Sequence, residues 1–221
     1  MFKKIFLTIL IIFLFIFVIP VKTGIHSAAF AQDTADQNFY FPLTRGSFWV
    51  YKLNNNVQLR FEVTGAETID GKQYSIISSS TAQDYKNAQK EYFFEDKDGI
   101  YLSKRTAPNL NEVYIPMLKK LPWDFSGNQS WEWTGTVSNI KTKISITVSG
   151  PENYNFKGGV YKAYKVIQVI KEDNQANPNN KTVITTWYIK GVGKVKEINE
   201  TFYGNNKSYF ITAELDICSI K

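Results

Sequence analysis

Apolar and polar residues alternate along several stretches of this chain, most regularly over residues 57–63, 144–148 and 209–217. A period of two places one set of side chains on each face of a β-strand. Val, Ile, Thr, Tyr and Trp, which favour strands, dominate these runs. Turn-forming pairs such as Asp70-Gly71 and Gly158-Gly159 separate them. The pattern predicts an all-β protein.

Two stretches, residues 41–102 and 121–198, resemble each other loosely and are predicted to be two related halves. Residues 103–122 are expected to link them, because Pro108, Pro116 and Pro122 break a long element. A closing strand follows at residues 208–217. The paired positions are Trp49 with Trp131, Gly65 with Gly150, and Gly99 with Gly193.

Neither half is long enough to bury a good core alone, so residues 40–221 are predicted to be one domain. The expected fold is a single curved antiparallel sheet, a half-barrel or open barrel. The alternative is a chance likeness between two strand-rich segments.

Residues 1–31 have the order of a secretory signal peptide. Lys3 and Lys4 precede fifteen residues, Ile5 to Ile19, of which only Thr8 is polar. Ala31 and Gln32 flank the predicted cleavage site, and residues 32–39 form a short linker. Cleavage would place the protein in the periplasm, the cell envelope or the medium. The alternative is an uncleaved N-terminal anchor, which would be the only membrane contact.

The leader carries three lysines and no acid, so its removal lowers the formal net charge from +6 to +3. No long basic stripe remains, and nucleic acid is not expected as a partner. The single histidine, His26, lies in the leader, which excludes Ser-His-Asp and Cys-His catalysis and histidine metal ligands in the mature chain. Cys218 is the only cysteine and is expected to be a packed side chain.

Acidic residues near a turn are the remaining candidates for metal binding or catalysis. Asp96-Lys97-Asp98-Gly99 matches only a fragment of a calcium loop and is interpreted as a charged hairpin turn. No metal and no cofactor is therefore expected. Glu95, Asp96, Asp98 and Asp124 could form a carboxylate pair across the fold, which leaves a carboxylate-dependent envelope hydrolase as the alternative function.

Three motifs carry a resemblance to a known group of proteins. They are Pro42-Leu43 followed by Gly46-x-x-Trp49-x-Tyr51, then Gly127-x-x-x-Trp131-x-Trp133, and Thr186-Trp187-Tyr188-x-x-Gly191-Val192-Gly193-x-Val195-Lys196. Residues 40–217 resemble a broad family of bacterial exported β-rich proteins of unknown function. That family is architecturally similar to the half-barrels of periplasmic lipoprotein carriers. The resemblance implies no catalytic residues.

Aromatic residues are the candidate ligand contacts. Those proposed to line the concave face are Trp49, Tyr51, Trp131, Trp133 and Trp187. Core packing is the alternative role for them. The strand of Trp49 also has Phe48 and Val50 on its other face, so its outer side should be covered. The favoured function is a non-enzymatic exported binding protein for a hydrophobic or glycan ligand, or an envelope protein.

Overall fold

The computed structural model describes residues 40–221, except 82–83, 85–86, 174–178 and 205. Every described residue belongs to one compact unit, Asp36–Lys221. The predicted signal peptide, its cleavage site at Ala31 and Gln32, and the linker 32–39 lie outside the described residues.

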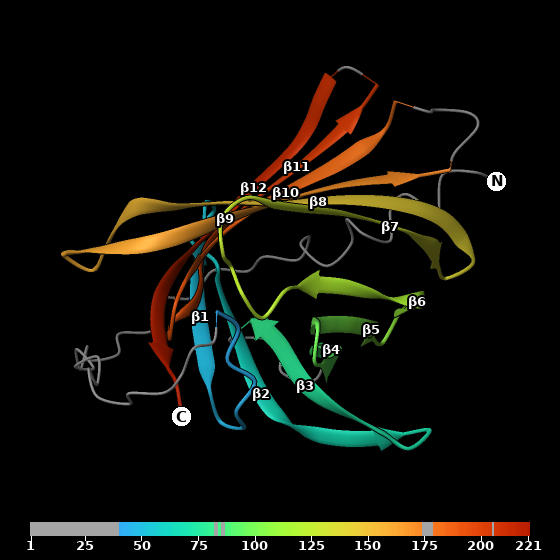
Figure 1. Cartoon of the computed structure of the whole chain (residues 1–221), viewed down its shortest axis with the longest axis horizontal. Coiled ribbons are helices and arrows are strands. Elements are labelled where there is room, and N and C mark those ends of the chain that lie inside the picture. The colour runs from blue at the N-terminus through green and yellow to red at the C-terminus, as the bar shows by residue number, and fades with distance from the viewer. Residues whose placement is uncertain (1–39, 82–83, 85–86, 174–178, 205) are drawn as a thin grey trace. The chain divides into compact units, whose positions relative to one another are not determined.

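The described part of the chain is all-β, as the alternation predicts, and contains twelve strands (Figure 1). Among its residues no helix is long and apolar enough to cross a membrane. The strands are β1 (Phe48–Leu53), β2 (Gln58–Ile69), β3 (Lys72–Thr81), β4 (Gln89–Asp96), β5 (Gly99–Ala107), β6 (Leu110–Leu121), β7 (Gln129–Val137), β8 (Ile140–Phe156), β9 (Gly159–Glu172), β10 (Lys181–Ile189), β11 (Gly193–Tyr203) and β12 (Asn206–Ser219).

The sheet closes on itself. The prediction of a half-barrel or open barrel is therefore correct in its curved antiparallel sheet and wrong in leaving the barrel open. Each strand pairs antiparallel with the next, and β12 pairs with β1 to complete the barrel. Trp49 is opposite Phe61 on β2 and Cys218 on β12, which shows that β1 has a partner on both sides. Closure leaves neither the first nor the last strand as an open edge, which a half-barrel would have exposed.

Residues 103–122 are not a linker, because they form the end of β5 and all of β6. Pro116 is tolerated within β6 for a local reason. The β5–β6 register shifts between Leu102 and Lys104, and the β6–β7 ladder stops at Ile115. Pro116 therefore lies where neither neighbouring strand needs its missing N–H.

The weakest join in the barrel is between β6 and β7, which we call the seam. Only Tyr114 with Val137, and Ile115 with Thr136, pair across it in the ladder. Beyond the ladder, the backbone N–H of Ser138 in the β7–β8 turn donates to Val113 at 3.1 Å. The remainder of the seam is joined by side chains, described below.

The β8–β9 hairpin extends beyond its neighbouring strands at one side of the barrel (Figure 1). It contacts β10, where Trp187 donates to Glu152 of the hairpin. A register shift between Ser149 and Glu152 marks the point where it bends away. Lys157 at its tip forms a 3.5 Å ion pair with Asp216 on β12. This hairpin therefore covers part of the sheet's outside.

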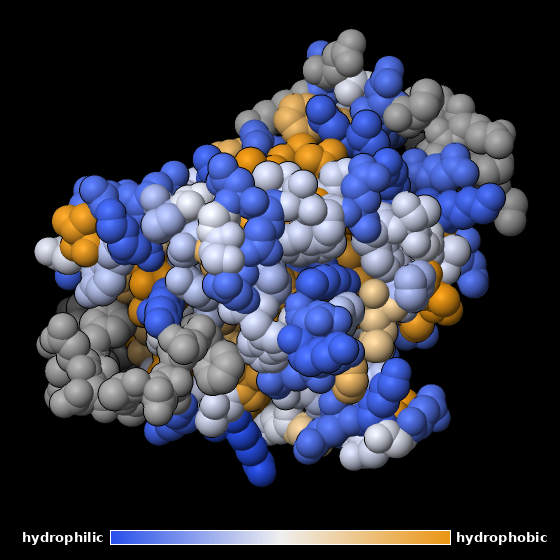
Figure 2. All heavy atoms as spheres, viewed as in Figure 1, coloured by the Kyte–Doolittle hydropathy of each residue, from blue (hydrophilic) through white to orange (hydrophobic). Residues whose placement is uncertain are grey.

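The outer side of β1 is covered by its neighbour, as its two apolar faces required. The guanidinium of Arg60 lies 3.8 Å from the centre of the Phe48 ring. Arg60 is held there by hydrogen bonds of 2.9 and 3.0 Å to Glu62. Elsewhere the face shown in Figure 2 is mainly hydrophilic, with small separate hydrophobic patches.

Candidate functional site

One part of the barrel interior is apolar and tightly packed. Residues ahead of β1 fill it, because Phe41 contacts the rings of Phe93 and Tyr188 at centroid distances of 5.0 and 6.4 Å. Tyr40 packs 4.3 Å from Phe125, a residue of the β6–β7 connection that is 2% exposed. Aromatic side chains therefore fill this part of the described core.

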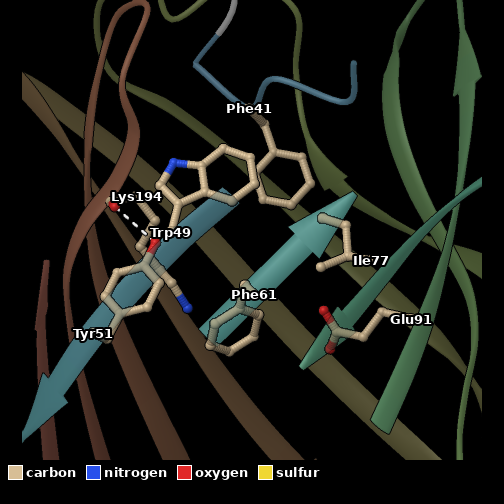
Figure 3. A pocket seen from close by; sticks show the side chains of 7 residues that line it. All are labelled: Phe41, Trp49, Tyr51, Phe61, Ile77, Glu91 and Lys194. Atoms are coloured by element: carbon tan, nitrogen blue, oxygen red, sulfur yellow. Dashed lines mark hydrogen bonds between the residues drawn. The ribbon is translucent and has the colours of Figure 1, made fainter. Parts of the chain in front are cut away.

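Next to this packed region is a cavity of about 40 Å³ (Figure 3). A buried water needs at least roughly 10–15 Å³ measured in the same way, so the cavity has room for a few waters or one small chemical group. It is too small for a whole glycan or lipid, whose pockets run from about 300 Å³ upward. Its walls are formed by Phe41, Trp49, Tyr51, Phe61, Ile77, Glu91 and Lys194.

Glu91 and Lys194 belong to a larger set of inward-facing charged side chains, which we call the lumen cluster. The sheet register places them inside, since Glu91 is opposite Ile77 and Glu197 is opposite the buried Thr186 and Ala213. The members of the lumen cluster are Glu91 on β4, Arg105 on β5, Glu112 and Lys120 on β6, and Lys194 and Glu197 on β11.

Ion pairs join most of the lumen cluster. Arg105 contacts Glu91 at 2.7 Å and Glu112 at 3.7 Å. Lys194 contacts Glu197 at 3.0 Å. Burial favours the neutral form of Glu197, but Lys194, with smaller effects from Lys120 and Arg105, outweighs it and holds the pKa of Glu197 below its ordinary value. The ammonium of Lys194 also lies 4.9 Å from the ring centre of Tyr51 and 4.8 Å from that of Phe61.

Lys120 differs from the other cations. Its ammonium donates a 3.0 Å hydrogen bond to the side-chain oxygen of Gln168 on β9, which is 2% exposed. Among the described residues no carboxylate lies within ion-pair distance of it. Burial and then the charge of Arg105 lower the pKa of Lys120 from 10.5 to about 8, against the opposing effect of Glu91 and Glu197.

The lumen cluster is enclosed by the barrel wall and yet accessible to water. Side-chain exposure is 15% for Glu91, 24% for Arg105, 16% for Lys194 and 29% for Glu197. Inward-facing side chains keep such exposure only if solvent enters the barrel. The interior therefore contains a small hydrated space with charged walls, bordered by the aromatic cavity.

Trp49 and Tyr51 are the predicted ligand contacts that line the cavity. Both are buried, with 4% and 2% exposure. Their polar atoms are directed to backbone rather than to open space: the Trp49 indole donates to the carbonyl of Val192 at 2.7 Å, and the Tyr51 hydroxyl donates to that of Lys194 at 2.8 Å (Figure 3). These bonds bridge β1 to β11 and to the turn before it, over the intervening β12.

Trp131 and Trp133 lie at the seam and not at the cavity. The indole of Trp131 donates to the carbonyl of Lys119 at 3.0 Å, and the indole of Trp133 donates to that of Pro116 at 3.0 Å. Both acceptors are on β6, beyond the last ladder pair. The two tryptophans thus replace backbone pairing between β6 and β7.

Trp187 is separate from the other four. It lies on the outer face of β10, half-buried, and its indole donates a 2.6 Å hydrogen bond to Glu152 of the β8–β9 hairpin. The structure therefore groups Trp49 with Tyr51, and Trp131 with Trp133, and leaves Trp187 outside with the hairpin.

The acidic residues considered for hydrolysis are all exposed. Glu95 and Asp96 end β4, Asp98 is in the following turn, and Asp124 is in the β6–β7 connection. The carboxylates that do share a site are Glu91 and Glu112, both bound to Arg105.

Sequence reasoning missed the lumen cluster. One signal was available: Glu91 is two residues before the buried Phe93 on β4, so both side chains are on the same face of that strand. Lys120 is likewise two residues from the buried Leu118. A charge at an inward phase of a strand indicates an interior polar site, but the phase is certain only when the register shifts are known.

No protein-family model matches the sequence, and no curated protein matches it. Two solved structures resemble the fold. A candidate lipoprotein from Parabacteroides distasonis ATCC 8503 is 15% identical, with a TM-score of 0.45 over 83% of this chain and 100% of that one. A candidate exported protein with a YmcC-like fold from Bacteroides fragilis NCTC 9343 is 13% identical, with a TM-score of 0.38 over 82% of this chain and 99% of that one.

Proposed function

We propose that the protein is a non-catalytic binding protein that acts outside the cytoplasm and takes a small ligand into its barrel. Export rests on the predicted leader, residues 1–31. Binding rests on the lumen cluster, whose charged side chains face inward and remain accessible beside an aromatic cavity.

Charged side chains inside a barrel lower its stability, so their retention indicates a purpose. Enclosing charged groups costs stability even when they are paired, and well-packed apolar residues in their place are often neutral or stabilising. A barrel needed only as a scaffold could fill this space with apolar side chains, as it does around Phe93 and Leu102. A ligand with polar groups accounts for the retention of Arg105, Lys120 and Lys194 inside.

The size of the space limits the ligand. A cavity of about 40 Å³ beside hydrated side chains admits a small molecule, or the end group of a larger one. The ligand we propose has an apolar part, which contacts Trp49 and Phe61, and a polar part, which reaches Lys194 and Glu91. No observation favours the hydrolase, since its acids are exposed.

Native mass spectrometry tests this proposal. The full-length sequence is expressed in a bacterial host, and the protein is purified without denaturant and compared with its denatured mass. The account predicts a co-purifying small molecule in the wild type. In Ile77→Phe, which fills the cavity, this molecule should be lost while the circular dichroism spectrum stays that of a β protein.

Ser78→Val is the matched control, because Ser78 is adjacent on β3 and its side chain is directed to Thr64 across the opposite face. It should retain the ligand. A wild-type protein whose native mass equals its polypeptide mass, or a ligand held equally by Ile77→Phe, would contradict the proposal.

A further inference from the structure

Within the part of the chain that the structure describes, three cations of the lumen cluster face the interior, and of these Lys120 is held by a neutral group. Arg105 and Lys194 each have a carboxylate within 3.0 Å. Lys120 has only the Gln168 oxygen, at 3.0 Å. An ammonium has three N–H donors, so two remain for another partner.

The lumen cluster holds three cations and three carboxylates, but the carboxylates pair with Arg105 and Lys194 and leave Lys120 without one. Burial and the charge of Arg105 lower the pKa of Lys120, and the charge of Lys194 adds to this effect. Glu91 and Glu197 act in the opposite direction. A negative group placed beside Lys120 would offset the repulsion and replace the hydration that burial removes.

The structure also provides space and a second cation for that group. Arg105 is 24% exposed and Lys194 is 16% exposed, so both can be reached from the hydrated interior. The cavity is bordered by Lys194 and Glu91, which both act electrostatically on Lys120.

We propose that the barrel interior binds a small anion, a carboxylate or a phosphate group, whose oxygens accept hydrogen bonds from Lys120 with Arg105 nearby. This inference rests on the proposed function, because it names the chemistry of the ligand that the interior takes. Lys120 is then the residue that selects negative charge.

Binding of the anion is coupled to the protonation of Lys120. The neutral amine offers no charge, so affinity falls as the pH rises above about 8. The charged and titratable groups that act on Lys120 from the strands around it are Arg105 on β5, Glu91 on β4, and Lys194 and Glu197 on β11.

The test measures saturable stabilisation of the full-length protein by sodium acetate and by sodium phosphate, each at ionic strength fixed with sodium chloride. At pH 7 the midpoint of thermal unfolding should rise and reach a plateau with one of the two anions but not with added chloride. Response to acetate alone identifies a carboxylate site, and response to phosphate alone identifies a phosphate site.

Variants of Lys120 make the test specific. Lys120→Met should abolish the saturable response, whereas Lys143→Met, which removes an exposed outer charge paired with Glu132, should leave it unchanged. Lys120→Arg keeps the charge at all pH values used. It should bind the anion, and its dissociation constant should stay level from pH 7 to 9.5, while that of the wild type rises about tenfold per pH unit above 8.

The comparison of wild type with Lys120→Arg decides the question even if Lys120→Met does not fold. Equal pH dependence in the two proteins, or no saturable response to either anion at pH 7, would overturn the anion site. If a co-purifying molecule is nevertheless lost on filling the cavity with Ile77→Phe, the proposed function stands and only its anionic chemistry is rejected.

Discussion

The indole nitrogen of Trp133 on β7 donates a 3.0 Å hydrogen bond to the carbonyl oxygen of Pro116 on β6, at a point where the described ladder between these strands has ended. Trp131 makes the same kind of bond to Lys119, also at 3.0 Å. The barrel is thus closed at the seam by side chains. The aromatic pair that the sequence marks as a possible ligand contact has a structural task here.

Trp133→Phe tests this task, because it keeps an aromatic ring and removes the donor. We expect it to lower the free energy of unfolding by about 1–3 kcal/mol, since the Pro116 carbonyl loses its partner in a partly buried place. Trp187→Phe is the control, and its exposed acceptor Glu152 can turn to water, so its cost should stay below about 1 kcal/mol. Urea denaturation measures both. Equal losses of unfolding free energy in the two variants would contradict a structural role for the hydrogen bond from Trp133 to Pro116.

Gly193 is expected to tolerate no side chain. Its φ is +95°, and an added Cβ would lie 3.1 Å from the Trp49 indole nitrogen and 3.4 Å from Pro42. Gly193→Ala should cost about 2–4 kcal/mol and shift the tryptophan emission, because it also displaces the indole from Val192. Gly191→Ala has a similar φ of +72° and open space, so about 1 kcal/mol is expected. A Gly193→Ala protein as stable as Gly191→Ala would disprove the close approach.

Closure of the barrel at β1 and β12 predicts an unreactive thiol. Cys218 is opposite Trp49 in the β1–β12 ladder and is 8% exposed. Burial raises the pKa of Cys218 from 9.0 to about 11, which cuts the thiolate fraction at pH 8 by about 100-fold. Labelling with an aromatic disulfide reagent at pH 8 should therefore be at least about 100-fold slower in the folded protein than in guanidinium. A half-barrel with a free last strand would react at nearly the unfolded rate.

Lys120 makes stability depend on pH in a defined window. Below pH 8 both folded and unfolded states hold the proton, and the folded state bears the full cost of the enclosed charge. Between about 8 and 10.5 the unfolded state binds more protons, so stability rises with pH. Relative to Lys120→Met, the wild type should gain at most about 3 kcal/mol over this window in urea titrations. A constant difference between the two proteins would contradict the lowered pKa.

The strand content could be predicted from the sequence because alternation reports it directly. Residues 144–148 and 209–217 lie within β8 and β12, and residues 57–63 lie within β2 except for Val57, which precedes it. Turn pairs were also informative: Asp70-Gly71, Asp98-Gly99 and Gly158-Gly159 each separate two paired strands. Strand alternation and turn-forming pairs depend on residues close together in the sequence, so they can be predicted without knowing the tertiary contacts.

Closure and β6 could not be predicted because they depend on distant partners. Pro116 marks a break by local rules, and only the absence of paired neighbours on both sides makes it acceptable in a strand. Similarly, nothing within residues 48–53 shows that β12 completes the barrel, since that pairing joins residues far apart in sequence. Trp187 shows the same limit, because the β8–β9 hairpin determines its surroundings.

The internal repeat remains a prediction, and the structure gives it a more definite form. Gly65 and Gly150 both lie at register shifts, in β2 and β8. Gly99 and Gly193 both begin strands, β5 and β11. Each pair is six strands apart in the barrel order, so we propose that β1–β6 and β7–β12 are the two related halves.

The measurement that tests the account most directly is the titration of the Lys120 ammonium itself. The ¹³Cε resonance of Lys120, assigned by its absence in Lys120→Arg, can be followed by NMR from pH 6 to 11.5. An enclosed lysine without a carboxylate partner predicts a midpoint near 8 that moves upward when acetate or phosphate is bound. A midpoint near 10.4, unchanged by either anion, would mean that Lys120 is an ordinary solvated lysine and that the barrel has no such interior site.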